Sequence, residues 1–213
     1  MPTNKTCLII SGGDFSPLPS KMPPFDYVIA CDRGYKYAPR FGLRPDIIIG
    51  DFDSASQPDT EIPVLVHPVM KDDTDTMLAV RHALEKGYRQ IVICCALGGR
   101  LDHAFANIQS LAFAAKAGAA ARILSEDTFI TVFPGGSMTF PRREGWSFSC
   151  FALSDTCKGV AIKGAKFTCG GLDISNTFPI GVSNVWAEDE ISVSCDAGIL
   201  MVVESKLRSG EHI

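Results

Sequence analysis

The stretch DIIIGDFDSAS, residues 46–56, joins a buried strand to a pair of acids. Residues 47–49 form a short apolar run, Gly50 ends it, and Asp51 and Asp53 follow two positions apart. A carboxylate beside a buried strand needs a cation, hydrogen-bond donors or water, because burying an isolated charge is costly. In an extended backbone residues i and i+2 point to the same side, so the two acids are expected to converge.

Similar apolar runs recur through the first two thirds of the chain and alternate with helical patterns. The expected strands are CLIIS (7–11), YVIAC (27–31), PVLVHP (63–68), QIVICCA (90–96), ARILSE (121–126) and FITVFPGG (129–136). The helical patterns cover residues 72–87 and 102–117, and a shorter piece at 35–42 is limited by Pro39. Apolar runs separated by helices predict an α/β fold with a mainly parallel sheet and flanking helices.

The pattern changes near residue 134. Beyond it, short alternating segments such as WSFSCFAL (146–153) and VAIKGAKFTC (160–169) are separated by Gly and Asp turns. Short strands at even spacing are typical of a small antiparallel β-sandwich or barrel. We therefore expect two domains, an α/β domain at 1–134 and a C-terminal β-sandwich at 135–213.

Composition excludes several classes of partner. The net charge is −4 and the pI is about 5.5, so no basic surface for nucleic acid is expected. No apolar run approaches the roughly 18 residues of a membrane span, and the first residues do not resemble a signal peptide. The eight cysteines include no CxxC pair and several lie in apolar runs. Buried reduced thiols in a cytoplasmic protein are expected.

Two further polar clusters follow predicted strands. Lys71-Asp72-Asp73-Thr74-Asp75 precedes a predicted helix, and Gly98-Gly99-Arg100-Leu101-Asp102-His103 precedes the next. Since ligands of open parallel sheets bind beyond the carboxyl ends of the strands, these clusters and the Asp51 pair are expected to share one site.

Each cluster has a structural and a functional interpretation. Any one acid at 72–75 could cap the helix, but three acids and a lysine in five residues exceed what capping requires. In the third cluster two glycines expose backbone amides at a helix start, which suits a phosphate, and Arg100 adds a fork of donors. His103 could be catalytic or a hydrogen-bonding scaffold residue. Gly12-Gly13-Asp14 could contact a nucleotide or form a tight turn.

Carboxylates beside a phosphate-binding loop favour Mg²⁺, which prefers carboxylates, waters and substrate phosphates. Zinc is disfavoured, because no His or Cys pair has ligand spacing. The chain has neither GxxxxGK[ST] nor GxGxxG. From the residues alone, the sequence predicts a Mg²⁺-dependent enzyme that acts on a nucleoside phosphate.

Four motifs in order also resemble the signatures of the thiamine pyrophosphokinase family. They are RPDIIIGDFDS (44–54), KDDTD (71–75), LGGRLDH (97–103) and GVSN (181–184). The resemblance implies an α/β domain followed by a β-sandwich, and transfer of a pyrophosphoryl group from ATP to the hydroxyl of thiamine, giving thiamine diphosphate and AMP. It also implies a requirement for Mg²⁺ and a homodimer whose active sites are shared between subunits.

The resemblance assigns roles to individual positions. Its metal-binding acids match Asp51, Asp53 and Asp75. The residues it places around the nucleotide and its phosphates match Asp32, Lys71, Asp72, Thr74, Gly98, Gly99, Arg100 and Asp102. Asp51, Asp53, Asp75, Arg100 and Asp102 are the expected catalytic residues, and Ser183 and Asn184 match the residues that meet thiamine.

Two departures from the family pattern concern the nucleotide and thiamine. The family often has Asp-Gly-Gly where this chain has Asp32-Arg33-Gly34. Animal members carry a late tryptophan over thiamine, whereas the matching GILMVVES (198–205) has no aromatic residue. Trp186 does not match that position and receives no such role.

Two rival functions are weighed against this one. A non-catalytic module that binds a nucleotide or thiamine would tolerate loss of the acids. A phosphatase would use an aspartyl nucleophile, but that residue usually follows the first strand of its domain, whereas Asp51 follows the third. The general base of the transfer reaction stays unassigned, because a metal-bound carboxylate is a weak base.

Overall fold

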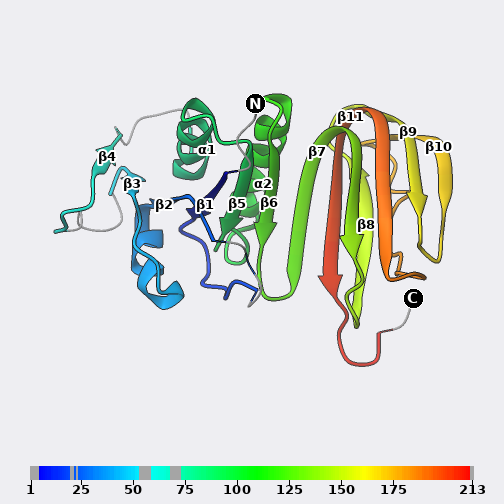
Figure 1. The fold of residues 1–213 in the computed structure, drawn as a ribbon, viewed down its shortest axis with the longest axis horizontal. Coiled ribbons are helices and arrows are strands. Elements are labelled where there is room, and N and C mark those ends of the chain that lie inside the picture. Colours follow the sequence, from blue (N-terminus) through cyan, green and yellow to red (C-terminus); the bar gives the residue numbers. More distant parts are fainter. Residues whose placement is uncertain (1–4, 20–21, 23, 53–58, 68–72, 212–213) are drawn as a thin grey trace. The chain divides into compact units, whose positions relative to one another are not determined.

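The computed structural model describes all residues of the chain except 1–4, 20–21, 23, 53–58, 68–72 and 212–213. The chain forms two compact units, unit 1 at Met1–Glu126 and unit 2 at Asp127–Ile213. Figure 1 shows helices and strands alternating in the blue-to-green part of the chain and strands in the yellow-to-red part.

Unit 1 is built on parallel strands in the order β6-β5-β1-β2-β3-β4. Their bounds are β1 Thr6–Ile10, β2 Tyr27–Cys31, β3 Ile47–Gly50, β4 Val64–Val66, β5 Gln90–Cys94 and β6 Ala120–Leu124. The central runs are apolar because helices and loops cover them, and Leu8, Ile9 and Ile93 are fully buried. The predicted α/β class with a mainly parallel sheet is confirmed.

The register brings the carboxyl ends of the central strands together. Ile10 of β1 lies opposite Ala30 of β2 and Cys94 of β5, and Cys31 lies opposite Ile49 of β3. The loops after these four strands therefore leave one edge of the sheet. Parallel strands place any polar residues that follow them at that common edge.

In the described part of unit 1, four helical elements accompany this sheet. They are the α-helices α1 (Asp75–Glu85) and α2 (Leu101–Lys116) and the 3₁₀ helices η1 (Asp32–Lys36) and η2 (Ala38–Phe41). Helix α1 packs on β1, β2 and β3 and against α2, whereas η1 packs on β2 and β3. Pro39 lies in the first turn of η2 and Gly42 closes it in a left-handed conformation, so the expected helical piece is short.

The structure divides the chain earlier than the expected boundary at residue 134. Strand β7 runs without interruption over Thr128–Pro141, and residues 128–134 pair antiparallel with residues 199–205 of β11. The apolar run FITVFPGG therefore belongs to unit 2. Periodicity alone does not tell whether a buried apolar strand pairs in parallel or antiparallel.

Unit 2 consists of antiparallel strands, as predicted. With β7 they are β8 Trp146–Ala152, β9 Thr156–Lys163, β10 Cys169–Ser175 and β11 Glu190–Lys206. Strand β11 changes partners along its length, because residues 192–197 pair with β9 and residues 200–206 pair with β8. The register shift between Cys195 and Ile199 allows this exchange.

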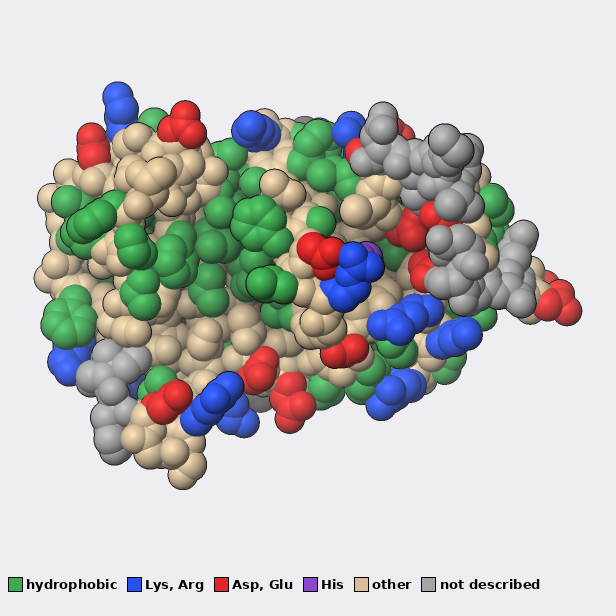
Figure 2. Space-filling model, turned by 180° about the vertical axis from the view of Figure 1, so that it is seen from behind, with side chains coloured by type: hydrophobic (Ala, Val, Ile, Leu, Met, Phe, Trp, Pro, Cys, Tyr) green, Lys and Arg blue, Asp and Glu red, His purple; other side chains and the backbone are tan. Residues whose placement is uncertain are grey.

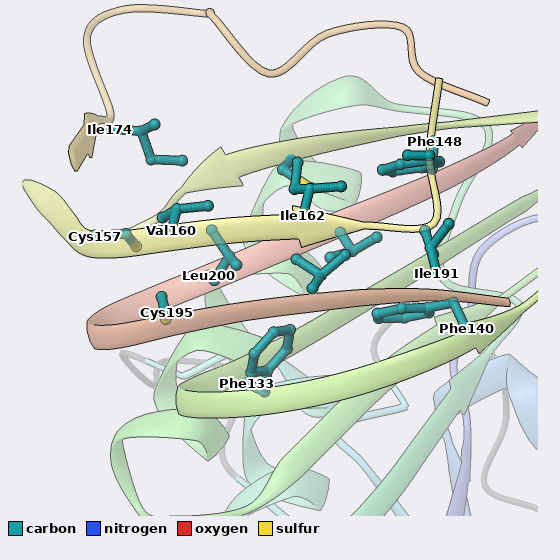
Figure 3. Packing of buried hydrophobic residues seen from close by; sticks show 14 of the residues in the cluster. Phe133, Phe140, Phe148, Cys157, Val160, Ile162, Ile174, Ile191, Cys195 and Leu200 are labelled. Atoms are coloured by element: carbon teal, nitrogen blue, oxygen red, sulfur yellow. The ribbon is translucent and has the colours of Figure 1, made fainter. Parts of the chain in front are cut away.

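The core of unit 2 lies between these strands. Phe133, Phe140, Phe148, Ile162 and Leu200 are buried and face one another in Figure 3. In β8 and in most of β11 buried residues alternate with more exposed ones, so this layer follows the period-two pattern of the sequence. Burial of such side chains stabilises the fold by roughly 1.5–3 kcal/mol each.

Seven of the eight cysteines are buried free thiols, as expected, and Cys169 is half-buried. Among the described residues, no helix is both long and apolar enough to span a membrane.

Candidate active site

A cavity of about 510 Å³ opens at the carboxyl edge of the unit 1 sheet. We call it the unit-1 cavity. Its walls come from the loops after β1, β2, β3 and β5 and from the first turns of α1 and α2. It is lined by Ser11, Gly12, Gly13, Asp14, Cys31, Asp32, Arg33, Asp51, Thr74, Asp75, Thr76, Ala96, Gly98, Gly99, Arg100, His103, Ala106 and Asn107.

The loop after β1 is a tight glycine turn pressed against the loop after β5. The backbone amides of Ser11 and Gly13 donate to the carbonyls of Cys94 and Cys95 at 2.9 and 2.8 Å. A Cβ on Gly13 would lie 2.5 Å from the Cys95 oxygen, so no other residue fits without displacing backbone. The turn therefore belongs to the cavity wall, which suits either interpretation of Gly12-Gly13-Asp14.

Three half-buried carboxylates enter the cavity from separate elements. Asp32 follows β2, Asp51 follows β3 and Asp75 lies in the first turn of α1. Gly50 permits this convergence, since a Cβ there would lie 3.2 Å from the Cα of Asp32. The backbone at Gly50 is thus approached closely by the loop after β2.

The start of α1 is fixed by hydroxyl groups. The side chain of Thr74 caps the helix and accepts from the amide of Met77 at 3.2 Å. The hydroxyls of Thr76 and Ser11 are buried and lie 2.9 Å apart, which ties α1 to the end of β1. Capping therefore belongs to Thr74, while Asp75 lines the cavity.

The loop before α2 places two left-handed glycines in the wall. Gly98 has φ 85° and Gly99 has φ 63°, a region that is costly for residues with a Cβ. A Cβ on Gly98 would also lie 2.6 Å from a carboxylate oxygen of Asp14. The two glycine turns of the cavity are therefore packed against each other.

Arg100 and Asp102 form an exposed two-point ion pair at the start of α2. Arg100 Nε lies 3.1 Å from Asp102 Oδ1, and Nη2 lies 2.5 Å from Oδ2. The guanidinium lowers the pKa of the Asp102 carboxyl, and the carboxylate raises the pKa of Arg100. Arg100 lines the cavity, whereas Asp102 lies against Arg100 and also accepts from the amide of His103 at 2.9 Å.

The cavity contains residues that the sequence did not single out. Asn107 is buried one turn beyond His103, and its Nδ2 donates to the Ala96 carbonyl at 2.8 Å. A polar residue at an otherwise apolar helical position is the signal that would have found it. Ser11 and Thr76 gave no such signal. Asp53, Lys71 and Asp72 lie outside the described residues.

Comparison with known proteins supports a single family. Residues 20–123 match the family model described as "Thiamin pyrophosphokinase, catalytic domain". Thiamine pyrophosphokinase of Bacillus subtilis is 28% identical over 211 residues, which cover 94% of this chain and 99% of that protein.

Solved structures agree along nearly the whole chain. The crystal structure of thiamine pyrophosphokinase from Bacillus subtilis has a TM-score of 0.84 at 27% identity, covering 95% of this chain and 99% of that one. The crystal structure of thiamin pyrophosphokinase from Geobacillus thermodenitrificans has a TM-score of 0.82 at 28% identity. The match covers 96% of this chain and 99% of that one.

The chain is similar to thiamine pyrophosphokinases along nearly its whole length. The predicted resemblance and the prediction of an enzyme are both confirmed.

The remaining family motif, GVSN, lies in unit 2 beside a second cavity of about 270 Å³. We call this the unit-2 cavity. Its wall is mainly apolar and is lined by Cys150, Val160, Ile162, Phe167, Thr168, Cys169, Leu172, Ile174, Ile180, Gly181, Val182, Ser183 and Asn184. Ser183 adopts a left-handed conformation with φ 60°, and its amide donates to Ser149 Oγ at 3.1 Å.

Asn184 is buried and its amide group holds this wall together. Oδ1 accepts from the backbone amides of Phe167 and Val185 at 3.0 and 2.9 Å, and Nδ2 donates to the Phe167 carbonyl at 2.7 Å. Trp186 lies in the core, where its Nε1 donates to the Phe140 carbonyl at 3.1 Å. Within this family motif, therefore, Asn184 fixes the backbone, while the Ser183 side chain lies on the exposed part of the loop.

Proposed function

We propose that the chain transfers a pyrophosphoryl group from ATP to the hydroxyl of thiamine and forms thiamine diphosphate and AMP. The observation that carries this proposal is the unit-1 cavity, in which Asp32, Asp51 and Asp75 converge beside two glycine turns and Arg100. Similarity to the family supplies the substrate class, and the cavity supplies groups suited to a polyphosphate.

The charge of the cavity favours a metal complex of the nucleotide. Four aspartates and two arginines line it, so its described wall is net negative and would repel a bare triphosphate. No three described carboxylate, imidazole or thiol groups form a metal site by themselves. This fits Mg²⁺, which commonly uses one or two carboxylates and completes its coordination with waters and substrate phosphates.

Asp51 and Asp75 would hold the metal, together with Asp53 as the family resemblance implies. Bound Mg²⁺ would neutralise charge on the polyphosphate. The chain's own residues orient the reactants. The glycine turns let backbone approach the phosphates, and Arg100 presents two donors to phosphate oxygens. Thr74, and by resemblance Lys71 and Asp72, would complete this wall.

Catalysis would then come mainly from positioning. The thiamine hydroxyl attacks the β-phosphorus in line while AMP leaves, and little covalent chemistry is required of the protein. Asp102 would act through Arg100, because its carboxylate accepts from the same guanidinium donors that would meet phosphate oxygens.

We place thiamine at the unit-2 cavity. Its apolar wall suits flat heterocyclic rings, and Ser183 is a polar group at the edge that could fix their orientation. Asn184 would act indirectly by holding the backbone on either side of that wall.

We further propose a cytoplasmic homodimer with shared active sites. Unit 2 exposes Phe167, Leu172, Phe178, Ile180 and Val182, and such a patch commonly marks an interaction surface. Figure 2 shows hydrophobic side chains gathered over one face of unit 2, with charged groups mostly at its margin. A second copy is the occupant that the family resemblance implies, using the same surface on both partners.

Incubation with ATP, MgCl₂ and thiamine, followed by separation of the nucleotides, tests the reaction. AMP formed only in the presence of thiamine and Mg²⁺ is the expected result. ADP in its place would indicate transfer of a single phosphoryl group, and neither product would favour a binding module.

Mixing two inactive variants tests the shared site. Asp51→Asn disables unit 1, and Leu172→Trp fills the unit-2 cavity while keeping the surface apolar. In a mixed dimer one shared site has both defects and the other has none. Random exchange in an equal mixture should therefore restore about a quarter of wild-type activity. No recovery despite proven exchange would place both halves of the site within one chain.

A further inference from the structure

Arg33 lines the unit-1 cavity and, with Tyr37, donates to backbone carbonyls of the turn after β1. We call these contacts of Arg33 and Tyr37 the brace. Nε of Arg33 donates to the carbonyl of Gly12, and its Nη2 donates to the carbonyl of Gly13 at 3.3 Å. The hydroxyl of Tyr37 donates to the same Gly13 carbonyl at 3.0 Å. One guanidinium and one phenol thus hold both carbonyls of the glycine turn after β1.

These bonds set the direction of the peptide dipoles in the turn. In a trans peptide the N–H points opposite to the C=O. With the Gly13 carbonyl directed at Arg33 and Tyr37, the amide of Asp14 points to the opposite side. The brace therefore fixes the direction of both carbonyls and places positive charge beside their oxygens, which would otherwise repel phosphate.

The guanidiniums of Arg33 and Arg100 have different partners. Arg100 is paired with the carboxylate of Asp102. Arg33 donates instead to neutral backbone carbonyls, so these contacts leave its positive charge available to an anion in the cavity. The guanidinium meets the two carbonyls with donors in a fixed planar arrangement, whereas a lysine presents a single ammonium on a flexible stem.

We infer that Arg33 is a positioning residue for the nucleotide: it holds the Gly12–Asp14 turn in place and supplies positive charge to the wall that faces the phosphates. The inference rests on the proposed use of this cavity for ATP. It assigns a role to a position that departs from the family pattern.

The fold provides anchors for the turn that do not involve Arg33, so its replacement can be studied in a folded protein. The ring of Phe15, just beyond the turn, stacks on Phe41 at 5.2 Å and meets Tyr37 edge-on at 5.6 Å. The guanidinium of Arg40 lies over the same ring at 3.3 Å. Removal of Arg33 should loosen the carbonyls of the turn without releasing its end.

The test compares Arg33→Met and Arg33→Lys with Lys36→Met. Lys36 lies on the same 3₁₀ helix and carries the same charge, but its ammonium lies over the Tyr35 ring at 5.7 Å. ATP binding in the presence of Mg²⁺ is measured calorimetrically without thiamine. KM for each substrate and kcat are measured separately, and thermal melting verifies folding.

Arg33→Met should weaken ATP binding by about tenfold, as expected for loss of hydrogen bonds made by a charged group. Arg33→Lys should recover only part of that loss, KM for thiamine should stay unchanged, and Lys36→Met should change ATP binding by less than about twofold. If the methionine variant does not fold, the lysine variant alone decides, through the same ATP measurement.

Three outcomes would overturn the inference: wild-type ATP affinity in Arg33→Met, full recovery in Arg33→Lys, or equal weakening in Lys36→Met. Failure of the proposed function looks different, because the wild-type protein itself would then neither bind ATP nor form AMP.

Discussion

The two cavities of the molecule are built on opposite principles. The unit-1 cavity of about 510 Å³ is lined by carboxylates, guanidiniums and glycine turns, whereas the unit-2 cavity of about 270 Å³ is mainly apolar. In unit 1 the charged groups face the open space. In unit 2 the side chain of Asn184, which is polar and buried, forms its hydrogen bonds with backbone groups of the protein.

The two units also differ in how many non-glycine residues adopt a positive φ near their cavities. In unit 1 three non-glycine residues, Asp32, Phe52 and Cys95, adopt positive φ directly after or near the ends of β2, β3 and β5. In unit 2 only Ser183 does so among the described residues, and it lines the cavity. Such residues cost on the order of 1 kcal/mol or more each and cluster at functional sites. The difference teaches that the unit-1 cavity is suited to select a ligand by charge and backbone direction, and the unit-2 cavity by shape.

The largest expected effect removes a charge from unit 1. Asp51→Asn should lower kcat by about a hundredfold or more, because loss of a metal-binding carboxylate removes several kcal/mol of charge stabilisation. The melting temperature should not fall, since Asp51 shares the cavity with the like charges of Asp32 and Asp75.

Asp73→Asn is the matched control for this prediction. Asp73 lies just before α1, and its carboxylate pairs with the guanidinium of Arg81 at 2.8 Å. Because this pair is partly exposed and Asp73 does not line the cavity, kcat should stay within about twofold. Wild-type activity in Asp51→Asn with a lower melting temperature would show that Asp51 is structural.

A second prediction separates backbone strain from the close contact of the glycine turns. Gly98→Ala and Gly87→Ala both place a Cβ at φ near +85°, with φ values of 85° and 87°. Each should cost about 1 kcal/mol of unfolding free energy. A Cβ on Gly98 would also lie 2.6 Å from Asp14, whereas one on Gly87 would meet nothing within 4 Å.

Only Gly98→Ala should therefore displace the cavity wall and raise KM for ATP, by about tenfold on the scale of a lost phosphate contact. Steady-state kinetics and thermal melting of the two variants give the comparison. Equal kinetics in both variants would mean that the contact between the turns does not shape the cavity.

The third prediction tests whether unit 2 depends on its buried amide. Asn184→Ala leaves the amide and carbonyl of Phe167 without their partner, which should cost about 1–3 kcal/mol of unfolding free energy. Denaturant unfolding measures this loss, and the exposed Asn176→Ala should be nearly neutral.

ATP binding by the folded fraction of Asn184→Ala should stay unchanged, since the nucleotide is assigned to unit 1. A stable Asn184→Ala protein that binds thiamine poorly would instead make Asn184 a direct thiamine contact.

The succession of strands and helices along unit 1 and the chemistry at the strand ends could be predicted, because both follow from local patterns. Apolar runs that end in Gly-Asp or Gly-Gly place polar groups at one edge of a parallel sheet, and Asp51, Asp75, Gly98 and Arg100 line one cavity there. Ser183 and Asn184 carried no signal of their own and were reached through the family resemblance.

Features that depend on contacts distant in sequence could not be predicted. The brace of Arg33 joins residues about twenty positions apart through backbone carbonyls, which have no sequence signature. The place of residues 128–134 in unit 2 depends on pairing with β11, some seventy residues later. Periodicity reports which face of a strand is buried but not which strand lies beside it.

The smallest expected effect concerns the ion pair at the mouth of the unit-1 cavity. The Asp102 carboxylate accepts from Nε and Nη2 of Arg100, the donors that phosphate oxygens would use. The carboxylate therefore competes with the phosphates for Arg100. Asp102→Asn should not change the melting temperature measurably, because both side chains are exposed and screened by solvent. It should strengthen ATP binding by about twofold to threefold at low salt, and the gain should shrink as salt is added.

The pH dependence of this gain follows from the direction of the pKa shift. Arg100 lowers the pKa of Asp102, so the carboxylate stays ionised at neutral pH and the pair is lost only as the pH falls through that lowered pKa. The ratio of ATP affinities, Asp102→Asn over wild type, should therefore stay constant between pH 8 and about pH 5. Calorimetric titration at several pH values measures it. Weaker ATP binding by Asp102→Asn would mean that the carboxylate assists the nucleotide complex directly and does not compete with its phosphates for Arg100.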